Sequence, residues 1–402
     1  MRERRPELLI PASSLEVLKT AVIFGADAVY IGGEVFGLRA KAKNFSMEEM
    51  REGLTFAHEH GVRVHVTVNI LAHNRDLPGV EEYLKELKEL KPDALIIADP
   101  AIFELAKEIC PEIERHISTQ ANNTNYGTYR FWWNQGARRV VSARELSLAE
   151  IREIREKIPE EMEIESFIHG AMCISYSGRC LLSNYFTGRD ANQGACTHPC
   201  RWKYAVVEET RPGEYFPIGE DKEGTYIMNS RDMCMIEHIP ELIEAGISSF
   251  KIEGRMKSAY YAAIVTNAYR HAVDSAIKGE ALDPIWVEET EKLSHRPYCT
   301  GFYYGYPGQH YSKASYLSEA DVAAVVENCD GEGRALLTQR NKFYKGDELE
   351  LIGPNIKPVK FTVEHMYNAE GEEIEDTRHP MMEIHMTLPC PAPRLSIVRK
   401  CR

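Results

Sequence analysis

Short apolar runs rich in Val and Ile alternate along the chain with longer segments that carry apolar residues at helical spacing. Eight strands are predicted, at Glu7–Pro11, Ala28–Ile31, Arg63–Val68, Ala94–Ala98, Arg115–Ser118, Arg139–Val141, Ile164–Ile168 and Ser249–Ile252. Six helices are predicted between them, at Ser14–Phe24, Ser46–His60, Gly79–Glu89, Ala101–Cys110, Thr124–Gln135 and Ser147–Lys157. Because these units repeat eight times, the pattern favours an α/β fold of the TIM-like (β/α)8 barrel type over a doubly wound sheet.

The strand–helix repeat is interrupted after the seventh predicted strand. Residues 169–248 lie between two strands that a single helix normally joins, and a connection of this length usually carries function. Gly, Pro, Tyr and His are dense in residues 291–320, as in a linker. Short alternating segments then predict a small C-terminal β-barrel domain at 321–402, so that residues 1–290 form the barrel with its insertion.

Composition and charge place the chain among ordinary folded proteins. It has 402 residues, of which 44% are hydrophobic and 27% charged. The formal net charge of −13 is opposite in sign to that of most nucleic-acid-binding proteins, although a local basic patch is compatible with it. No stretch approaches the roughly 20 apolar residues of a membrane-spanning helix, and the apolar core near the N-terminus is short. We therefore expect a cytoplasmic protein without a membrane partner.

Four cysteines are crowded into the insertion. Cys173, Cys180, Cys196 and Cys200 have the spacing C-x6-C-x15-C-x3-C. Thiolate ligands select zinc, copper(I) or iron–sulfur clusters. Zinc fingers commonly use C-x2-C pairs, which are absent from this insertion, so an iron–sulfur cluster is favoured. Cys234 is a fifth candidate ligand.

Polar residues follow the predicted strands at the end of the barrel where active sites of this fold lie. They are Asn69, Asp99, Gln120, Arg144, His169, Glu253 and Arg255, with Arg39 and Asn44 in the loop after the second strand. Arg179, Arg189 and Arg201 lie in the insertion. Because a planar guanidinium binds carboxylate or phosphate through two parallel hydrogen bonds, several converging arginines predict an anion pocket.

Three segments carry a family resemblance: ESFIHGAMCISYSGRCLLS (165–183), GACTHPCRW (194–202) and FKIEGRMKS (250–258). They resemble the signature of the U32 "peptidase" or collagenase-like family, and the likeness extends from ELLIPASS near the N-terminus to HAVD at 271–274. Better understood members hydroxylate a tRNA wobble uridine, a ribosomal RNA cytidine or ubiquinone precursors without oxygen. In length and single-barrel layout the chain looks closest to the branch that forms 5-hydroxyuridine in tRNA.

The resemblance implies a [4Fe–4S] cluster bound by Cys173, Cys180, Cys196 and Cys200. Some relatives lack the last of these cysteines, which makes Cys234 the alternative fourth ligand. It also implies tRNA as the macromolecular partner, prephenate as a co-substrate, and a paralogous or accessory protein as a possible further subunit.

The roles of the remaining residues are inferred from chemistry alone. Arginines suit the carboxylates of prephenate, and the candidates are Arg39, Arg144, Arg179 and Arg255. Asn69, Gln120, Glu253 and Tyr176 are further candidates for substrate binding, and Tyr176, Tyr185 or Trp202 for stacking on a base. Because imidazoles ordinarily titrate near neutrality, His169 is a candidate proton donor or acceptor, and Arg144 and Arg255 complete the expected catalytic set. Basic residues of the C-terminal domain are expected to contact the RNA backbone.

Two alternatives stay open. One is a collagenase-like peptidase, although HEHG at His58–Gly61 lacks the spacing of a zinc protease and no G-x-S-x-G motif occurs in the sequence. The other is a noncatalytic RNA-binding or scaffold subunit whose cluster is structural. Loss of the fold on removal of a redox-silent cluster would favour the second.

Overall fold

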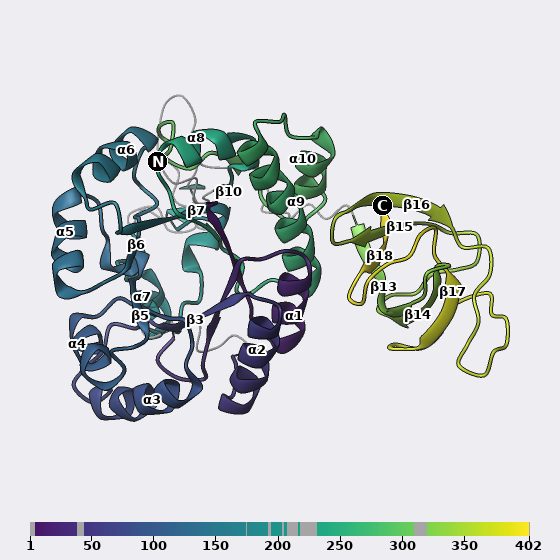
Figure 1. Cartoon of the computed structure of the whole chain (residues 1–402), viewed down its shortest axis with the longest axis horizontal. Coiled ribbons are helices and arrows are strands. Elements are labelled where there is room, and N and C mark those ends of the chain that lie inside the picture. Colours follow the sequence, from purple (N-terminus) through teal and green to yellow (C-terminus); the bar gives the residue numbers. More distant parts are fainter. Residues whose placement is uncertain are drawn as a thin grey trace. The chain divides into compact units, whose positions relative to one another are not determined.

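The computed structural model describes residues 5–37, 44–173, 175–191, 194–202, 205–206, 216–217, 231–308 and 320–401. Eight parallel strands form a closed sheet in the order β11-β1-β2-β3-β4-β5-β6-β7, because β11 also pairs with β7 (Figure 1). Their bounds are β1 Glu7–Pro11, β2 Ala28–Gly32, β3 Arg63–Val68, β4 Ala94–Ile97, β5 Glu114–Ile117, β6 Arg139–Val141, β7 Glu163–Ala171 and β11 Ser249–Ile252. The predicted TIM-like barrel is confirmed.

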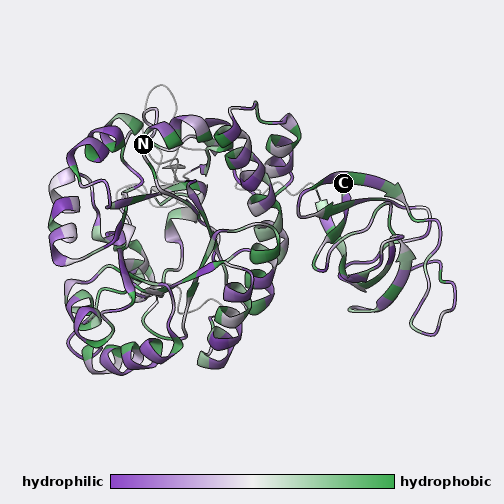
Figure 2. Cartoon of the chain, viewed as in Figure 1, coloured by the Kyte–Doolittle hydropathy of each residue, from purple (hydrophilic) through white to green (hydrophobic). Residues whose placement is uncertain are grey.

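Helices surround the strands, and each carries both hydrophilic and hydrophobic residues (Figure 2). They are α1 Leu15–Ile23, α2 Met47–Glu59, α3 Leu77–Leu90, α4 Pro100–Ile109, α5 Tyr126–Gln135, α6 Leu148–Lys157 and α8 Ile239–Glu244. Ser46 and Ser147 begin α2 and α6 with capping boxes, in which a Glu three residues later completes the reciprocal hydrogen bonds. None of the helices in the described ranges is long and apolar enough to cross a membrane.

The segment between β7 and β11 contains short elements. They are α7 Leu182–Thr187, the 3-10 helices η3 Pro199–Arg201 and η4 Ile236–His238, and the strands β8 Ala205–Val206, β9 Phe216–Pro217 and β10 Asp232–Cys234. β10 runs antiparallel to the end of β7, so that Cys234 lies opposite His169. β12, Tyr298–Cys299, pairs with β10 in parallel. The barrel sheet is thereby extended beside the strand that leads into the cysteines.

The chain divides into two compact units. Residues 1–19, 27–257 and 296–316 form the barrel unit, and residues 20–26, 258–295 and 317–402 form the second unit. The second unit holds α9 Ala259–Lys278, α10 Pro284–Glu291 and the strands β13 Ala320–Cys329, β14 Arg334–Gln339, β15 Glu348–Gly353, β16 Ile356–Thr362, β17 Glu383–Thr387 and β18 Ile397–Cys401. The finer boundaries at residues 290 and 321 stay predictions.

The six C-terminal strands form an antiparallel sheet in the order β16-β15-β18-β13-β14-β17. Their apolar side chains share one core, with Leu337, Leu351 and Val398 fully buried. Within the same unit, the buried guanidinium of Arg399 donates to Glu289 of α10 at 2.7 Å and to Glu350 of β15 at 2.6 Å. α10 is therefore joined to the sheet by buried charges.

The amino-terminal half of the barrel interior is lined by charged side chains. The buried guanidinium of Arg139 on β6 donates to Glu165 at 2.9 Å and to Glu163 at 2.7 Å, both on β7, and it also donates to Glu7 on β1. Lys251 on β11 donates to Glu165 at 2.6 Å. Because these are the strands on either side of the barrel closure, the buried charges join β1, β6, β7 and β11. We call Glu7, Arg139, Glu163, Glu165 and Lys251 the charged layer.

Burial and charge shift the pKa values of groups in this region. Burial alone would raise the pKa of Glu165, but the charges of Lys251 and Arg139 outweigh it and lower the pKa to about 2. Burial lowers the pKa of His65, beside the charged layer, to about 3. It also lowers the pKa of His116 well below its ordinary value. Both imidazoles are therefore neutral in the folded protein at neutral pH.

These shifts predict a loss of stability in mild acid. The pKa of His65 falls from 6.5 in its ordinary state to about 3 when folded, so between these values the unfolded chain binds a proton that the folded chain does not. The free energy of unfolding should therefore fall as the pH falls through this window, by about 1.4 kcal/mol per pH unit for each buried histidine. Urea unfolding at about pH 7.0 to 4.5, which covers the upper part of the window between the two pKa values, measures this slope.

The variant His65→Gln tests which group carries this slope. His65→Gln should reduce the pH slope by one proton, whatever its effect on stability at pH 7. A wild-type free energy of unfolding that is flat across this range would contradict the assignment.

Candidate active site at the carboxyl end of the barrel

Two amides from neighbouring loops lie together at the carboxyl ends of the strands. Asn69 follows β3 and Gln120 follows β5, and the Nδ2 of Asn69 donates to Oε1 of Gln120 at 2.8 Å. The hydroxyl of Ser118 donates to the same oxygen at 2.8 Å. The two predicted substrate-binding residues are thus brought together, with Ser118 holding the amide of Gln120 in one orientation.

Arg255, which follows β11, is buried in the wall of this site. Its Nη1 donates to Thr67 Oγ1 at 3.2 Å and its Nη2 donates to Asn44 Oδ1 at 2.8 Å. The guanidinium lies against the backbone of Gly32, where an added Cβ would be 2.2 Å from Nη2. Gly32 therefore leaves the space that Arg255 occupies, and the side chain is positioned from β2, β3 and β11 at once.

Arg144 links the end of β6 to the cysteine insertion. Its guanidinium carbon lies 3.9 Å from the centre of the Phe167 ring. Nη2 is 3.7 Å from Glu253 Oε2, and Nη1 donates to the thiol of Cys173 at 3.8 Å. Two predicted site residues, Arg144 and Glu253, therefore form an ion pair, and the arginine also contacts a predicted cluster ligand.

His169 lies at the same end of β7 but is covered. Its ring is buried and lies 5.4 Å from the ring of Tyr298, centre to centre. The next residue, Gly170, has a φ of +102°, and a Cβ there would lie 2.4 Å from the carbonyl oxygen of Glu253. The close approach of these two backbones requires glycine and sets the position of His169 beside Glu253.

Two further predicted substrate-binding residues, Arg179 and Tyr176, lie on the insertion. Arg179 Nε donates to the side-chain oxygen of Asn122, and Asn122 Nδ2 donates to the carbonyl of Ser177 at 2.9 Å. These bonds hold the first part of the insertion against the loop after β5. The ring of Tyr176 is exposed. Arg39 lies outside the described residues.

The cysteines of the insertion are free thiols, as are all ten in the chain. Cys196 Sγ accepts a hydrogen bond from the backbone N–H of His198 at 3.4 Å, and Cys173 Sγ accepts the bond from Arg144. Such N–H donors are a recognised feature of cluster-binding thiolates, whose potential they tune. Cys180, Cys200 and Cys234 are partly buried. Cys173 is exposed. These residues fit an iron–sulfur cluster in donor type and, at Cys173 and Cys196, in hydrogen bonding.

A compact group of possible metal ligands lies elsewhere, beside the charged layer. His65, His116 and Glu165 are fully buried, with one potential ligand atom each within 4.8 Å of the others. Glu165 already accepts hydrogen bonds from Lys251 and Arg139, whose positive charges oppose a bound cation. We therefore interpret this group as part of the barrel core.

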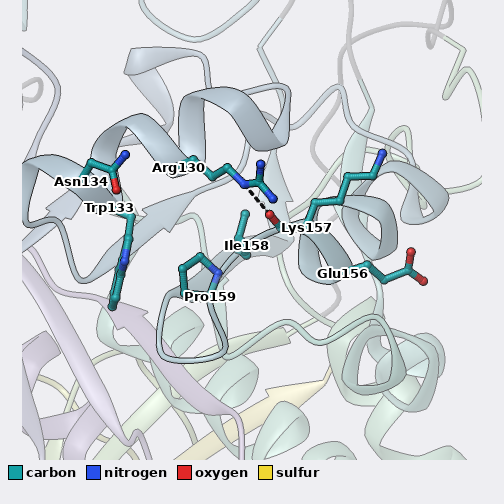
Figure 3. Close-up of a pocket in the computed structure, with 7 residues that line it drawn as sticks. All are labelled: Arg130, Trp133, Asn134, Glu156, Lys157, Ile158 and Pro159. Atoms are coloured by element: carbon teal, nitrogen blue, oxygen red, sulfur yellow. Dashed lines mark hydrogen bonds between the residues drawn. The ribbon is translucent and has the colours of Figure 1, made fainter.

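A hollow of about 480 Å³ lies on the outside of the barrel (Figure 3). It is lined by residues of α5 and of the end of α6, namely Arg130, Trp133, Asn134, Glu156, Lys157, Ile158 and Pro159. Arg130 Nε donates to the carbonyl of Lys157 at 2.6 Å. Because the chain enters β7 from here, the hollow lies toward the amino ends of the strands and is separate from the candidate site.

Sequence reasoning missed four contacts of the site: Thr67, Ser118, Phe167 and Tyr298. Thr67 and Phe167 lie within predicted strands, two positions before Asn69 and His169. Residues two apart point to the same face of a strand, so this alternation was the available signal. Tyr298 lies far along the chain and offered no local signal.

The backbone contact at Gly170 predicts a large, site-specific loss of stability. Gly170→Ala should lower the free energy of unfolding by about 2–4 kcal/mol, because it combines a positive φ with a clash against the carbonyl of Glu253. Gly188→Ala is the matched control, since Gly188 also has a positive φ but has no atom within 4 Å of an added Cβ. Its cost should be about 1 kcal/mol. Equal costs in urea unfolding would contradict the close approach.

Comparison with known proteins identifies the family. Residues 13–313 match Peptidase family U32, and residues 318–399 match the Peptidase family U32 C-terminal domain. The tRNA hydroxylation protein P1 of Bacillus subtilis (strain 168) is 43% identical over 396 residues, 96% of this chain and 92% of that protein. The tRNA hydroxylation protein P of Escherichia coli (strain K12) is 41% identical, over 92% of this chain and 90% of that protein. The 23S rRNA 5-hydroxycytidine C2501 synthase of E. coli is 32% identical, over 95% of this chain and 58% of that protein. The chain therefore belongs to Peptidase family U32.

Proposed function

We propose that the chain is a tRNA hydroxylase that forms 5-hydroxyuridine at the wobble position, in an oxygen-independent reaction that uses prephenate and a [4Fe–4S] cluster. One observation carries the proposal: Arg144 contacts both Glu253 at the barrel mouth and the thiol of Cys173 in the insertion. A group that can bind a carboxylate thus lies beside a proposed cluster ligand. The names of the relatives, two tRNA hydroxylation proteins and an rRNA hydroxycytidine synthase, support RNA hydroxylation.

The cysteines of the insertion would bind the cluster. Cys173, Cys180 and Cys196 are three of the proposed ligands, and Cys200 is the fourth, with Cys234 as its alternative. When bound, a [4Fe–4S] cluster supplies one-electron redox chemistry. The N–H groups of Arg144 and His198 stabilise negative charge on the two thiolates that they contact.

The arginines would bind the carboxylates of prephenate. Arg255 is 4% exposed, and a guanidinium away from water binds a carboxylate more strongly than one in solvent. Arg144 offers the second positive charge, with Arg39 and Arg179 as further candidates. The amides of Asn69 and Gln120 lie at the same end of the barrel, where they suit hydroxyl or carbonyl groups of a substrate. His169 is the candidate for moving a proton, because the backbone N–H of Glu253 donates to its carbonyl at 2.9 Å and so holds this histidine at the same end of the barrel.

The peptidase alternative has little support in the geometry. His58 and His60 lie at the end of α2 on the outside of the barrel, where His58 binds Asp93 and His60 bonds to the carbonyl of Phe56. Neither histidine is at the candidate site. A noncatalytic subunit with a structural cluster is the second alternative, and loss of RNA modification in site variants that keep their iron would exclude it.

Basic side chains in the loops between the C-terminal strands are paired with carboxylates. Lys342 and Arg378 both bind Asp376, and Lys345 binds Glu373. Phosphate contacts there would compete with these carboxylates. Because exposed ion pairs are weak, RNA contacts of these basic residues stay a prediction, and an accessory or paralogous subunit is retained as a further partner.

The first prediction of this proposal concerns iron. Protein purified without oxygen should be brown and contain about four iron atoms per chain, because four thiolates match the ligand demand of a cubane cluster. Cys173→Ser, Cys180→Ser and Cys196→Ser should each abolish the visible absorbance. Cys110→Ser is the matched control, because Cys110 is a buried thiol directly after α4 that bonds to the carbonyl of Ala106.

The fourth ligand is tested by the same measurement. Cys200→Ser should remove the absorbance and Cys234→Ser should leave it nearly intact. The reverse result would assign Cys234 as the ligand. Stoichiometric zinc in place of iron would contradict the proposed cofactor.

The second prediction concerns the arginines. Arg255→Ala and Arg144→Ala should keep the iron but reduce 5-hydroxyuridine in tRNA at least about tenfold in complemented cells, because each removes a partner for a carboxylate. Arg255→Lys should rescue only part of the activity, since an ammonium lacks the planar fork of donors. Gly32→Ala should resemble Arg255→Ala, because the added methyl group displaces the guanidinium.

Arg130→Ala is the control for these variants, because Arg130 lies in the outer hollow at the other end of the barrel. Nucleoside mass spectrometry should show full modification with Arg130→Ala. Full modification with both Arg255→Ala and Arg144→Ala would move the anion site elsewhere.

A further inference from the structure

Three aromatic side chains of the insertion are exposed and close to one another. Tyr185 and Phe186 on α7 are 82% and 46% exposed, and Trp202 just after η3 is 44% exposed. The ring centres of Tyr185 and Phe186 are 5.2 Å apart, and those of Phe186 and Trp202 are 6.2 Å apart. We call these three residues the aromatic platform.

Exposed aromatic rings in contact with one another need a reason. Burial of a large ring is favourable, so adjacent exposed rings usually mark a surface that binds a partner. Leu181, at the start of α7, is also exposed and extends the apolar surface. None of these side chains contributes to the buried core of the barrel.

Hydrogen bonds hold the platform in place. α7 is too short to be stable alone, but the backbone N–H of Thr197 donates to Ser183 Oγ at 3.0 Å. The hydroxyl of Thr187 donates to the carbonyl of Ser183 at 2.6 Å and closes the last turn. The rings therefore sit on a positioned helix and do not have to be ordered at the moment of binding, which reduces the entropic cost.

The same bonds place the platform beside the predicted cluster ligands. Thr197 directly follows Cys196, and η3, which contains Cys200, ends next to Trp202. The hydrogen bond between Ser183 and Thr197 thus joins α7 to the segment that carries Cys196. A ligand stacked on the rings would lie on the segment that carries the chemistry.

The arginines of the insertion favour a ligand that carries phosphates. Residues 173–202 contain three arginines, one aspartate and no lysine or glutamate, although the whole chain has a net charge of −13. Aromatic faces together with arginines are the combination that binds unpaired bases and their phosphates in single-stranded RNA. An apolar protein partner would not require these arginines.

We propose that Tyr185, Phe186 and Trp202 form a stacking platform for unpaired nucleobases of the RNA substrate. The inference rests on the proposed function in taking tRNA as the substrate, and it adds the surface that binds the exposed bases. Stacking on aromatic faces tolerates any base, so the platform would position the loop, and the pocket at the barrel mouth would select the base to be modified.

Binding of an unmodified tRNA transcript to the iron-loaded, full-length protein tests the platform. Tyr185→Ala, Phe186→Ala and Trp202→Ala should each raise the Kd by about fivefold to a hundredfold, the range expected for loss of one stacked base. The dependence of Kd on salt should keep its slope, because no phosphate contact is lost. Trp202→Phe and Tyr185→Phe retain a ring and should bind within about threefold of the wild type.

Phe131→Ala is the matched control, because Phe131 is an exposed ring on α5 outside the insertion. Its Kd should equal that of the wild type. Unchanged affinity in all three platform Ala variants would overturn the proposal, as would an equal loss in Phe131→Ala. If an Ala variant loses its iron, the test uses the variants that retain a ring. Weak tRNA binding by iron-loaded Trp202→Phe would then overturn the proposal.

The outcome is separable from that of the proposed function. Weakened tRNA binding by the platform variants would support the platform even if the tRNA carried no hydroxylated uridine. Full wild-type affinity in those variants, together with normal 5-hydroxyuridine in cells, would overturn the platform alone.

Discussion

The pairing of buried Glu165 with Lys251 and Arg139 is the constraint on which the rest of the structure depends. Leaving one of these charges without its partner inside the barrel would cost about 3–5 kcal/mol. The strands β6, β7 and β11 must therefore keep the register that satisfies all three charges, with Glu7 joining β1 to the same group. Since a shift of one residue would turn every side chain to the other face, this register also fixes what the opposite end of the barrel presents.

The charged layer and the candidate site thus occupy two ends of the same strands. The charges of the charged layer are paired with one another and with the neighbouring Arg63 and Arg138, whereas the carboxyl ends present Arg144, Arg255 and the amides of Asn69 and Gln120. β7 connects the two, because it carries Glu165 near its start, His169 near its end, and leads into Cys173. A fixed β7 places the cysteine insertion beside the arginines, which is the arrangement that RNA hydroxylation with a cluster and a dicarboxylate would need.

Sequence reasoning predicted the barrel because its signals are local. The apolar runs gave strands such as Arg63–Val68 at their observed bounds, and Ser46 and Ser147 mark helix starts through capping chemistry. The residues after the strands were also predictable, and Asn69 and Gln120 do meet. Arg255 with Gly32, His169 with Tyr298, and β10 with β7 were not predictable, because each joins segments far apart in sequence and depends on packing. The buried charges were missed because they interrupt otherwise apolar strands, where only their alternation with Val and Ile indicated an inward position.

The central claim is that this chain hydroxylates tRNA uridine, and one measurement tests it most directly. The chain is expressed in E. coli that lacks its own tRNA hydroxylation protein P, the cells are grown without oxygen, and tRNA nucleosides are quantified by mass spectrometry. Our account predicts that 5-hydroxyuridine appears with the wild-type chain and not with Cys173→Ser. Two results would contradict this account. One is tRNA that lacks 5-hydroxyuridine in cells that contain the iron-loaded wild-type protein, and the other is equal modification with the wild-type chain and with Cys173→Ser.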